Sequence, residues 1–141
     1  GLVLTINIWI LQIDTIMNNK KILGIAGLFM AVAVATGAFG AHMMKDILTP
    51  ARLETWNTAV LYHFLNTLGL MALALASEHY NIDLKAPAIF ILAGIIIFSG
   101  SLYTLCIADI SFFGMITPVG GVSFIIGWSL FATRLFKSEK S

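Results

Sequence analysis

Charged residues are scarce in this chain, since only 11% of its 141 residues are Asp, Glu, Lys or Arg. An ordinary soluble domain has about 25% charged and about 45–50% apolar residues, whereas 59% of this chain is hydrophobic. A soluble protein of this composition could not cover its apolar surface with polar groups. The composition therefore predicts an integral membrane protein. A net charge of +1 says little about partners, and nothing in the sequence indicates nucleic-acid binding.

Cysteine and intramembrane acids are also lacking. Cys106 is the one cysteine and lies inside an apolar run, which excludes a disulfide framework and a cysteine-type zinc site. The apolar runs contain no Asp or Glu in their interiors, so a drug-proton exporter with an intramembrane acid is disfavoured. Because no Ser-His-Asp set, carboxylate pair or HExxH motif lies on any run, we predict a protein that is not an enzyme and has no cofactor.

Four long apolar runs are present. About 20 residues, at 1.5 Å each, cross a hydrocarbon layer of about 30 Å, and runs of this length are typical of helices rather than barrel strands. We predict an all-α integral membrane protein, a four-transmembrane-helix bundle that forms one domain over residues 17–141. The predicted spans are residues 22–41, 58–76, 87–108 and 117–136.

Residues 1–16 do not fit this scheme, because they are too short for a span and include Asn7, Gln12 and Asp14. The stretch "MNNKKILG" from Met17 is how a small membrane protein usually begins. We therefore predict a native start at Met17 and a non-native extension before it. The alternative is a genuine interfacial helix.

Two Thr-Pro pairs indicate where helices begin. Thr49 before Pro50 is a favourable N-cap and first-turn pair, so the second helix is expected to begin there, with Trp56 at the level of the lipid headgroups. Thr117 before Pro118 predicts a similar start for the fourth span.

The basic residues are distributed unevenly between the two ends of the predicted bundle. Only Lys45 and Arg52 belong to the end opposite the termini. The end that holds the termini has six, which predicts cytoplasmic termini in a plasma or inner membrane: Lys20, Lys21, Lys85, Arg134, Lys137 and Lys140.

Polar side chains within the second span share one helix face, because His63, Asn66 and Thr67 are spaced i, i+3 and i+4. One interpretation is hydrogen bonding between helices, worth about 0.6 kcal/mol per contact. The other is a histidine that accepts protons near neutral pH, or a polar pocket in the outer half of the membrane. Its candidate residues are His42, Trp56, His63, Asn66, Ser101 and Tyr103. His42 and His63 are expected at different depths, so we predict no haem or metal site.

Small residues recur every fourth position in the first span, in the sets Gly27, Ala31, Ala35 and Ala33, Gly37, Ala41. In lipid, such faces allow close approach of helix backbones. The residues predicted to serve helix packing are Gly37, Gly40, Ala41, Gly100, Gly120, Gly121 and Gly127.

Four motifs in register support a family resemblance: "GAFGAH", "WNTAVLYHF", "FSGSLY" and "TPVGG" followed by "GW". Together the motifs resemble the domain of unknown function 423 family, which includes YgdD-like bacterial inner-membrane proteins and the eukaryotic transmembrane protein 256. The resemblance extends from about Asn18 to Lys137 and implies a small four-span membrane protein. One departure is Asn66, where many relatives carry histidine. That difference argues against an obligatory histidine at this position and leaves a hydrogen-bonding role.

The family pattern falls on residues of all four spans. These are Gly37, Gly40, Ala41 and His42, then Trp56, Ala59 and Tyr62, then Ser99, Gly100, Ser101 and Tyr103, then Pro118, Gly120, Gly121, Gly127 and Trp128.

Two functional hypotheses follow. The favoured one is a non-enzymatic packing, assembly or interaction protein in the lipid bilayer, with a homo-oligomer or a membrane-protein partner. The alternative is a small binder or permease for a lipid, quinone or apolar solute, which requires a cavity between the spans in the outer half.

Overall fold

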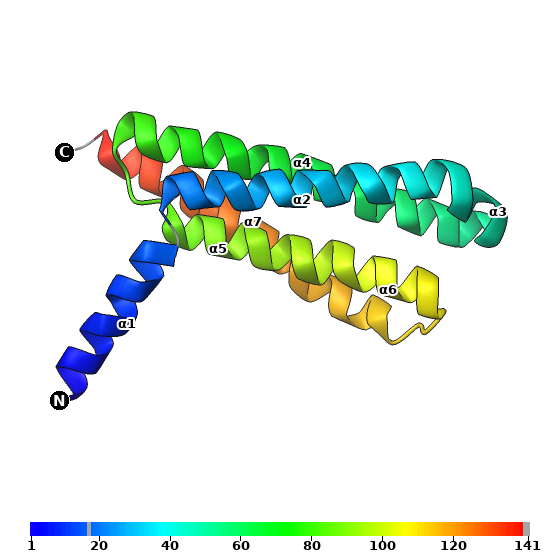
Figure 1. The fold of residues 1–141 in the computed structure, drawn as a ribbon, viewed down its shortest axis with the longest axis horizontal. Coiled ribbons are helices and arrows are strands. Elements are labelled where there is room, and N and C mark those ends of the chain that lie inside the picture. Colours follow the sequence, from blue (N-terminus) through cyan, green and yellow to red (C-terminus); the bar gives the residue numbers. More distant parts are fainter. Residues whose placement is uncertain (17, 140–141) are drawn as a thin grey trace.

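The computed structural model describes residues 1–16 and 18–139, and its elements over these residues are helices (Figure 1). Met17, on which the predicted start depends, and Lys140, one of the six basic residues, lie outside the described residues. In chain order the elements are α1 (Leu2–Ile16), α2 (Asn19–Phe39), the π-helical turn η1 (Gly40–Met44), α3 (Lys45–Ile47), α4 (Pro50–Tyr80), α5 (Lys85–Gly94), the π-helical turn η2 (Ile95–Ser99), α6 (Gly100–Ala108) and α7 (Phe113–Ser138).

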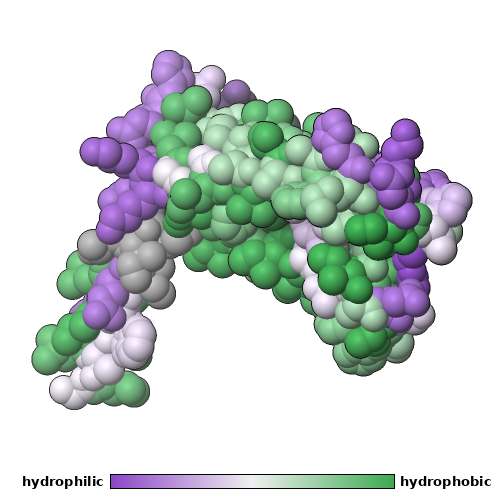
Figure 2. Space-filling view, turned by 45° about the vertical axis from the view of Figure 1, so that its right-hand side comes forward, coloured by the Kyte–Doolittle hydropathy of each residue, from purple (hydrophilic) through white to green (hydrophobic). Residues whose placement is uncertain are grey.

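Four helical segments are long and apolar enough to cross a membrane: Asn19–Ile47, Pro50–Tyr80, Lys85–Ala108 and Phe113–Ser138. Each contains one of the predicted spans, so the all-α four-span prediction is confirmed. The segments run side by side, and both chain ends lie at the same end of the bundle, as an even number of spans requires (Figure 1). Figure 2 shows apolar side chains over the middle of the bundle and hydrophilic ones gathered at its ends.

The N-terminal helix α1 leaves the bundle at an angle (Figure 1). Its 15 residues extend about 22 Å, which is less than the hydrocarbon thickness of about 30 Å. Large apolar side chains such as Leu2 and Trp9 are exposed on it. Whether this extension is native or interfacial stays a prediction.

The two Thr-Pro pairs differ in their outcome. The Thr49 hydroxyl accepts a hydrogen bond from the Arg52 backbone N–H at 3.2 Å, and Pro50 occupies the first turn, so this predicted start is confirmed. The predicted start at Thr117 is wrong, because α7 already begins at Phe113 and Pro118 lies inside it. Thr117 instead donates from its side chain to the Phe113 carbonyl one turn earlier, at 3.3 Å.

The helices pack as two hairpins. Helix α2 packs along α4, while the third span, formed by α5, η2 and α6, packs against both α7 and α4. Buried aliphatic residues such as Leu70, Leu73 and Ile91 form the larger core cluster. A second cluster surrounds Trp56 near the start of α4. Trp56 is only 3% exposed, so its ring packs inside the bundle, and its position at the level of the lipid headgroups stays a prediction.

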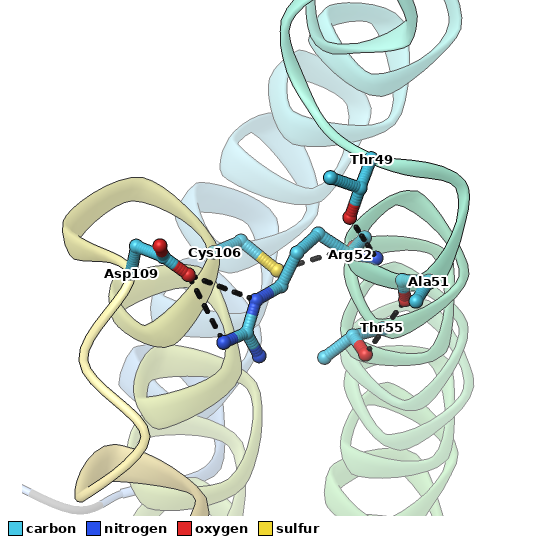
Figure 3. Close-up of polar contacts among 6 residues, drawn as sticks. All are labelled: Thr49, Ala51, Arg52, Thr55, Cys106 and Asp109. Atoms are coloured by element: carbon cyan, nitrogen blue, oxygen red, sulfur yellow. Dashed lines mark hydrogen bonds and ion pairs between the residues drawn. The ribbon is translucent and has the colours of Figure 1, made fainter.

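An ion pair joins the start of α4 to the end of α6 (Figure 3). The Asp109 Oδ1 atom accepts hydrogen bonds from Nε and Nη2 of Arg52 at 3.2 and 3.0 Å. The Cys106 thiol donates to the Arg52 carbonyl at 3.3 Å. Asp109 caps α6 in the left-handed conformation, with φ 54° and ψ 39°, which Asp and Asn tolerate better than most residues.

Two substitutions separate the charge of Asp109 from its backbone conformation. Asp109→Asn should lower the free energy of unfolding by less than about 1 kcal/mol, since exposed ion pairs contribute about 0–1 kcal/mol and this carboxylate is 80% exposed. Asp109→Val should cost about 1–2 kcal/mol more, because a branched side chain opposes the left-handed conformation. Unfolding titrations with sodium dodecyl sulfate measure both, and equal losses would contradict the backbone argument.

Candidate functional site

Three spans each contribute one polar side chain to a partly buried chain of hydrogen bonds. His63 of α4 lies with Nδ1 3.0 Å from the hydroxyl of Tyr103 on α6. The Tyr103 hydroxyl is also 3.0 Å from Oγ1 of Thr36 on α2, which donates to the Ala33 carbonyl at 3.1 Å. The imidazole also interacts with the backbone of Phe29 on α2. Tyr103 thus connects α2 and α4 from the third span.

Aromatic side chains enclose this chain. The Trp56 ring lies over Tyr103 at a centroid distance of 4.8 Å, and its Nε1 donates to the Thr36 carbonyl at 2.9 Å. Phe29 meets the His63 ring edge-on at 6.3 Å. His63 is 4% exposed, whereas Thr36 and Tyr103 are half-buried. Three of the predicted pocket residues, Trp56, His63 and Tyr103, therefore come together.

A groove of about 230 Å³ lies beside this cluster, between α2 and the third span with α4 behind it. Val32 on one side and Ile96 on the other are 53% and 61% exposed, so the groove opens sideways, toward the lipid. Its wall is almost entirely apolar. The lining residues are Phe29, Val32, His63, Ile95, Ile96, Ser99, Gly100 and Tyr103.

Two local features of the third span shape the groove. Ile95, Ile96 and Ser99 belong to the π-helical turn η2, a type of turn that is often found at functional sites. Gly100 has no atom within 4 Å of the position that a Cβ would occupy, so the missing side chain leaves open space. The Ser99 hydroxyl turns away and donates to the Ala59 carbonyl of α4 at 2.7 Å.

The other predicted pocket residues lie elsewhere. His42 is exposed near the turn between α2 and α4 and borders a shallow apolar hollow with Ala38 and Met43. Ser101 faces the fourth span, where its hydroxyl lies 2.6 Å from that of Thr117. Asn66 also pairs with the fourth span, through Trp128. The predicted pocket residues are thus divided between the groove, the interface with α7 and the exposed turn η1 that holds His42.

Asn66 holds α7 through its amide oxygen, while its amide nitrogen bonds within α4. The Trp128 Nε1 donates to its Oδ1 at 2.9 Å, and its Nδ2 donates to the Tyr62 carbonyl at 2.9 Å. Asn66→Leu should lower the free energy of unfolding by about 1–2 kcal/mol, because the indole N–H loses its acceptor. Asn66→His keeps an acceptor nitrogen and should cost less. Detergent unfolding compares the two variants, and a histidine as damaging as leucine would refute this role.

Four of the predicted packing glycines lie in close helix contacts. A Cβ at Gly40 would come within 2.7 Å of Trp56, one at Gly120 within 2.4 Å of Phe98 and one at Gly127 within 2.9 Å of Ile91. A Cβ at Gly37 would touch α4 at an ordinary 3.5 Å. These contacts lie within one chain, so these glycines allow the helices of a single bundle to pack closely.

Three members of the predicted packing set behave differently. Gly100 borders the groove instead of packing, and a Cβ at Gly121 would only approach Phe98 at 3.9 Å. Ala41 is exposed. It follows Ala33 by eight residues, which corresponds to a rotation of about 80° around the helix, away from the face that packs against α4. Gly40, seven residues after Ala33, stays within about 20° of that face.

Sequence reasoning missed Thr36, Phe29, Val32, Ile95 and Ile96. Thr36 had a usable signal, since it is the one hydroxyl residue in the run 22–41 and a hydroxyl in lipid needs a partner. The aliphatic lining residues had none, because an apolar side chain facing a groove has the same sequence pattern as one facing lipid.

Comparison with known proteins places Thr36, Ile95 and Ile96 within a region shared with a protein family. A family model described as "Protein of unknown function (DUF423)" matches residues 36–121. The chain is 43% identical over 108 residues to the UPF0382 membrane protein YwdK of Bacillus subtilis, covering 75% of this chain and 88% of that protein. It is 34% identical over 115 residues to the UPF0382 inner membrane protein YgdD of Escherichia coli, covering 81% and 88%. No solved structure matches the chain.

Proposed function

Because the chain belongs to the DUF423 family of membrane proteins, we propose that it acts by binding the apolar part of a membrane molecule in the groove beside His63 and Tyr103. It is proposed as a binder and not as an enzyme. The observation that carries this proposal is the groove itself, which is apolar, laterally open and placed between spans.

The volume of the groove limits the size of its occupant. An apolar cavity of about 150 Å³ holds a benzene molecule, whereas pockets for drug-sized ligands measure about 300–1,000 Å³. A groove of about 230 Å³ therefore fits one ring or a short length of chain. The remainder of such a molecule would stay in the bilayer, which agrees with an opening toward lipid.

We also propose that both termini face the cytoplasm, because basic residues such as Lys20, Lys21 and Arg134 lie at their end of the bundle. His63 lies thirteen residues after Pro50 and seventeen before Tyr80, so the groove lies near the middle of the membrane, on its outer side.

Fluorescence quenching of Trp56 tests binding. This ring is 3% exposed and packs against the groove residue Tyr103 at a centroid distance of 4.8 Å, so a brominated acyl chain that enters the groove comes close to it. Trp9, which is exposed, and Trp128, which is half-buried, are replaced by Phe to leave Trp56 as the one fluorophore. In vesicles containing dibromostearoyl phosphatidylcholine, we expect saturable quenching of Trp56.

Gly100→Leu supplies the test variant, because its side chain would fill the open space and should reduce quenching at least fivefold. Gly24→Leu is the matched control, since it adds the same side chain at a position with nothing within 4 Å, away from the groove. Quenching that stays unchanged in Gly100→Leu, at equal thermal stability, would refute binding in the groove.

A second function, assembly with another copy, is favoured by a separate observation. Gly27, Ala31 and Ala35 form an exposed small-residue face on α2, directed away from α4. Faces of this spacing associate in lipid by close backbone contact. Substitutions at Gly37 or Gly127 would disturb helix packing within the monomer, so the residue to substitute in a test of assembly is the exposed Ala31. Ala31→Leu should convert a dimer in cross-linking and light-scattering measurements to a monomer, and a wild-type protein that is monomeric in lipid would exclude assembly through this face.

A further inference from the structure

The polar groups around the groove are all committed to partners within the chain. His63 Nδ1 bonds to Tyr103, the Tyr103 hydroxyl bonds to Thr36, and the Ser99 hydroxyl bonds to the Ala59 carbonyl. Ser99 is 1% exposed and His63 4% exposed, so hardly any polar atom reaches the groove wall. A carbonyl or hydroxyl that entered the groove would lose its hydrogen bonds to water or headgroups and find no replacement.

We infer that the groove selects a plain hydrocarbon chain, such as the acyl chain of a lipid, and excludes ring headgroups that carry carbonyl or hydroxyl groups, such as quinones. This inference rests on the proposed binding function and specifies its ligand class. Discrimination arises because sites with paired polar groups reject ligands whose own polar atoms stay unpaired. The volume of about 230 Å³ accommodates a chain segment or a single ring, so the selection rests on the lack of a hydrogen-bond donor for the oxygens of a substituted ring.

Tyr103 is the residue that enforces this selection. Its hydroxyl occupies Nδ1 of the groove residue His63, which would otherwise present a polar atom to the groove. Tyr103→Phe removes one oxygen, keeps the ring that packs against Trp56 and frees Nδ1 of His63. In the variant Nδ1 of His63 can carry the ring proton and donate it to a ligand carbonyl, so the variant should accept a carbonyl that the wild type rejects.

The test uses the protein with Trp56 as its one tryptophan, in phosphatidylcholine vesicles with two probes at equal mole fraction. One probe is dibromostearoyl phosphatidylcholine, and the other is a benzoquinone with a decyl tail, which quenches tryptophan directly. In the wild type we expect at least tenfold weaker saturable quenching by the quinone than by the brominated chain. In Tyr103→Phe this ratio should fall to about threefold or less, with the melting temperature measured alongside to confirm a folded protein.

The outcomes separate the two claims. Saturable quenching by the brominated chain with equal or stronger quenching by the quinone overturns the selectivity and leaves the binding function intact. An absence of saturable quenching by both probes overturns the binding function itself. An unchanged ratio in a folded Tyr103→Phe protein also overturns the role given to Tyr103. A tenfold preference for the brominated chain in the wild type that falls to about threefold or less in Tyr103→Phe supports the inference.

Discussion

Replacing Gly120 with alanine is expected to lower the free energy of unfolding by about 3 kcal/mol, at the upper end of the usual cost of overpacking. A Cβ at this position would lie 2.4 Å from the backbone nitrogen of Phe98 and 2.8 Å from its Cα. Backbone atoms cannot rotate away as a side chain can. Relief would therefore require the third and fourth spans to separate along their contact.

Gly121→Ala is the matched control for this prediction, because it makes the same chemical change one residue further along the same helix. Its Cβ would meet only the Phe98 ring, at an ordinary 3.9 Å. Alanine also has a higher helix propensity than glycine, so this variant should be neutral or more stable by about 0.5–1 kcal/mol. Unfolding midpoints in sodium dodecyl sulfate compare the two, and similar losses would show that the backbone contact is unimportant.

The effect of Gly120→Ala should extend to the groove. Phe98 belongs to η2, whose residues Ile95, Ile96 and Ser99 line it. Displacement of this turn should therefore reduce quenching of Trp56 by the brominated chain along with stability. Gly121→Ala should leave both measurements near their wild-type values.

The fold could be predicted from the sequence to the level of four helices because apolar length alone decides whether a segment crosses a bilayer. The start of α4 could also be predicted, since the Thr49 cap is a local interaction between residues three apart. The start of α7 could not, because the identical Thr-Pro pattern is tolerated inside a helix near its beginning. There Thr117 bonds within its helix and to Ser101, an arrangement that depends on tertiary contacts.

The candidate site could be predicted only in part for a similar reason. Periodicity correctly placed His63 and Asn66 on an inward face, and both are buried. Their partners depend on the rotation of neighbouring helices, which no spacing within α4 specifies. His63 therefore meets Tyr103 of the third span, whereas Asn66, less than one turn further, meets Trp128 of the fourth.

The glycines show most clearly that the spacing of residues in the sequence does not specify contacts between helices. Gly100 and Gly120 look alike in the sequence, since both lie within apolar spans near other small residues. In the structure one leaves space beside a groove and the other allows two backbones to touch. Only the positions of other helices distinguish these roles, so a small residue in a span predicts close approach without saying whether a helix or a cavity fills the space.

Phe124→Ala is expected to have the second large effect on stability. The side chain is 6% exposed, and its ring centroid lies 5.7 Å from that of Phe98 and 6.3 Å from that of Tyr62. Truncation of a buried Phe costs about 3–5 kcal/mol in soluble proteins. In a bilayer the transfer contribution is absent, because lipid is as apolar as the core, so about 2–3 kcal/mol of lost packing should remain. Phe136→Ala, at a ring 69% exposed, is the control and should change stability by less than about 0.5 kcal/mol.

A double-mutant cycle with Gly94 shows whether Phe124 acts through direct packing. A Cβ at Gly94 would lie 2.5 Å from Cδ1 of the Phe124 ring, so Gly94→Ala alone should destabilise the protein. Once Phe124→Ala has removed the ring, the same methyl group enters the space that the ring occupied and restores part of the packing. The double variant should therefore be more stable than the sum of the two single losses predicts, by about 1 kcal/mol or more. Losses that simply add would mean that the contact between Phe124 and Gly94 does not hold the third and fourth spans together.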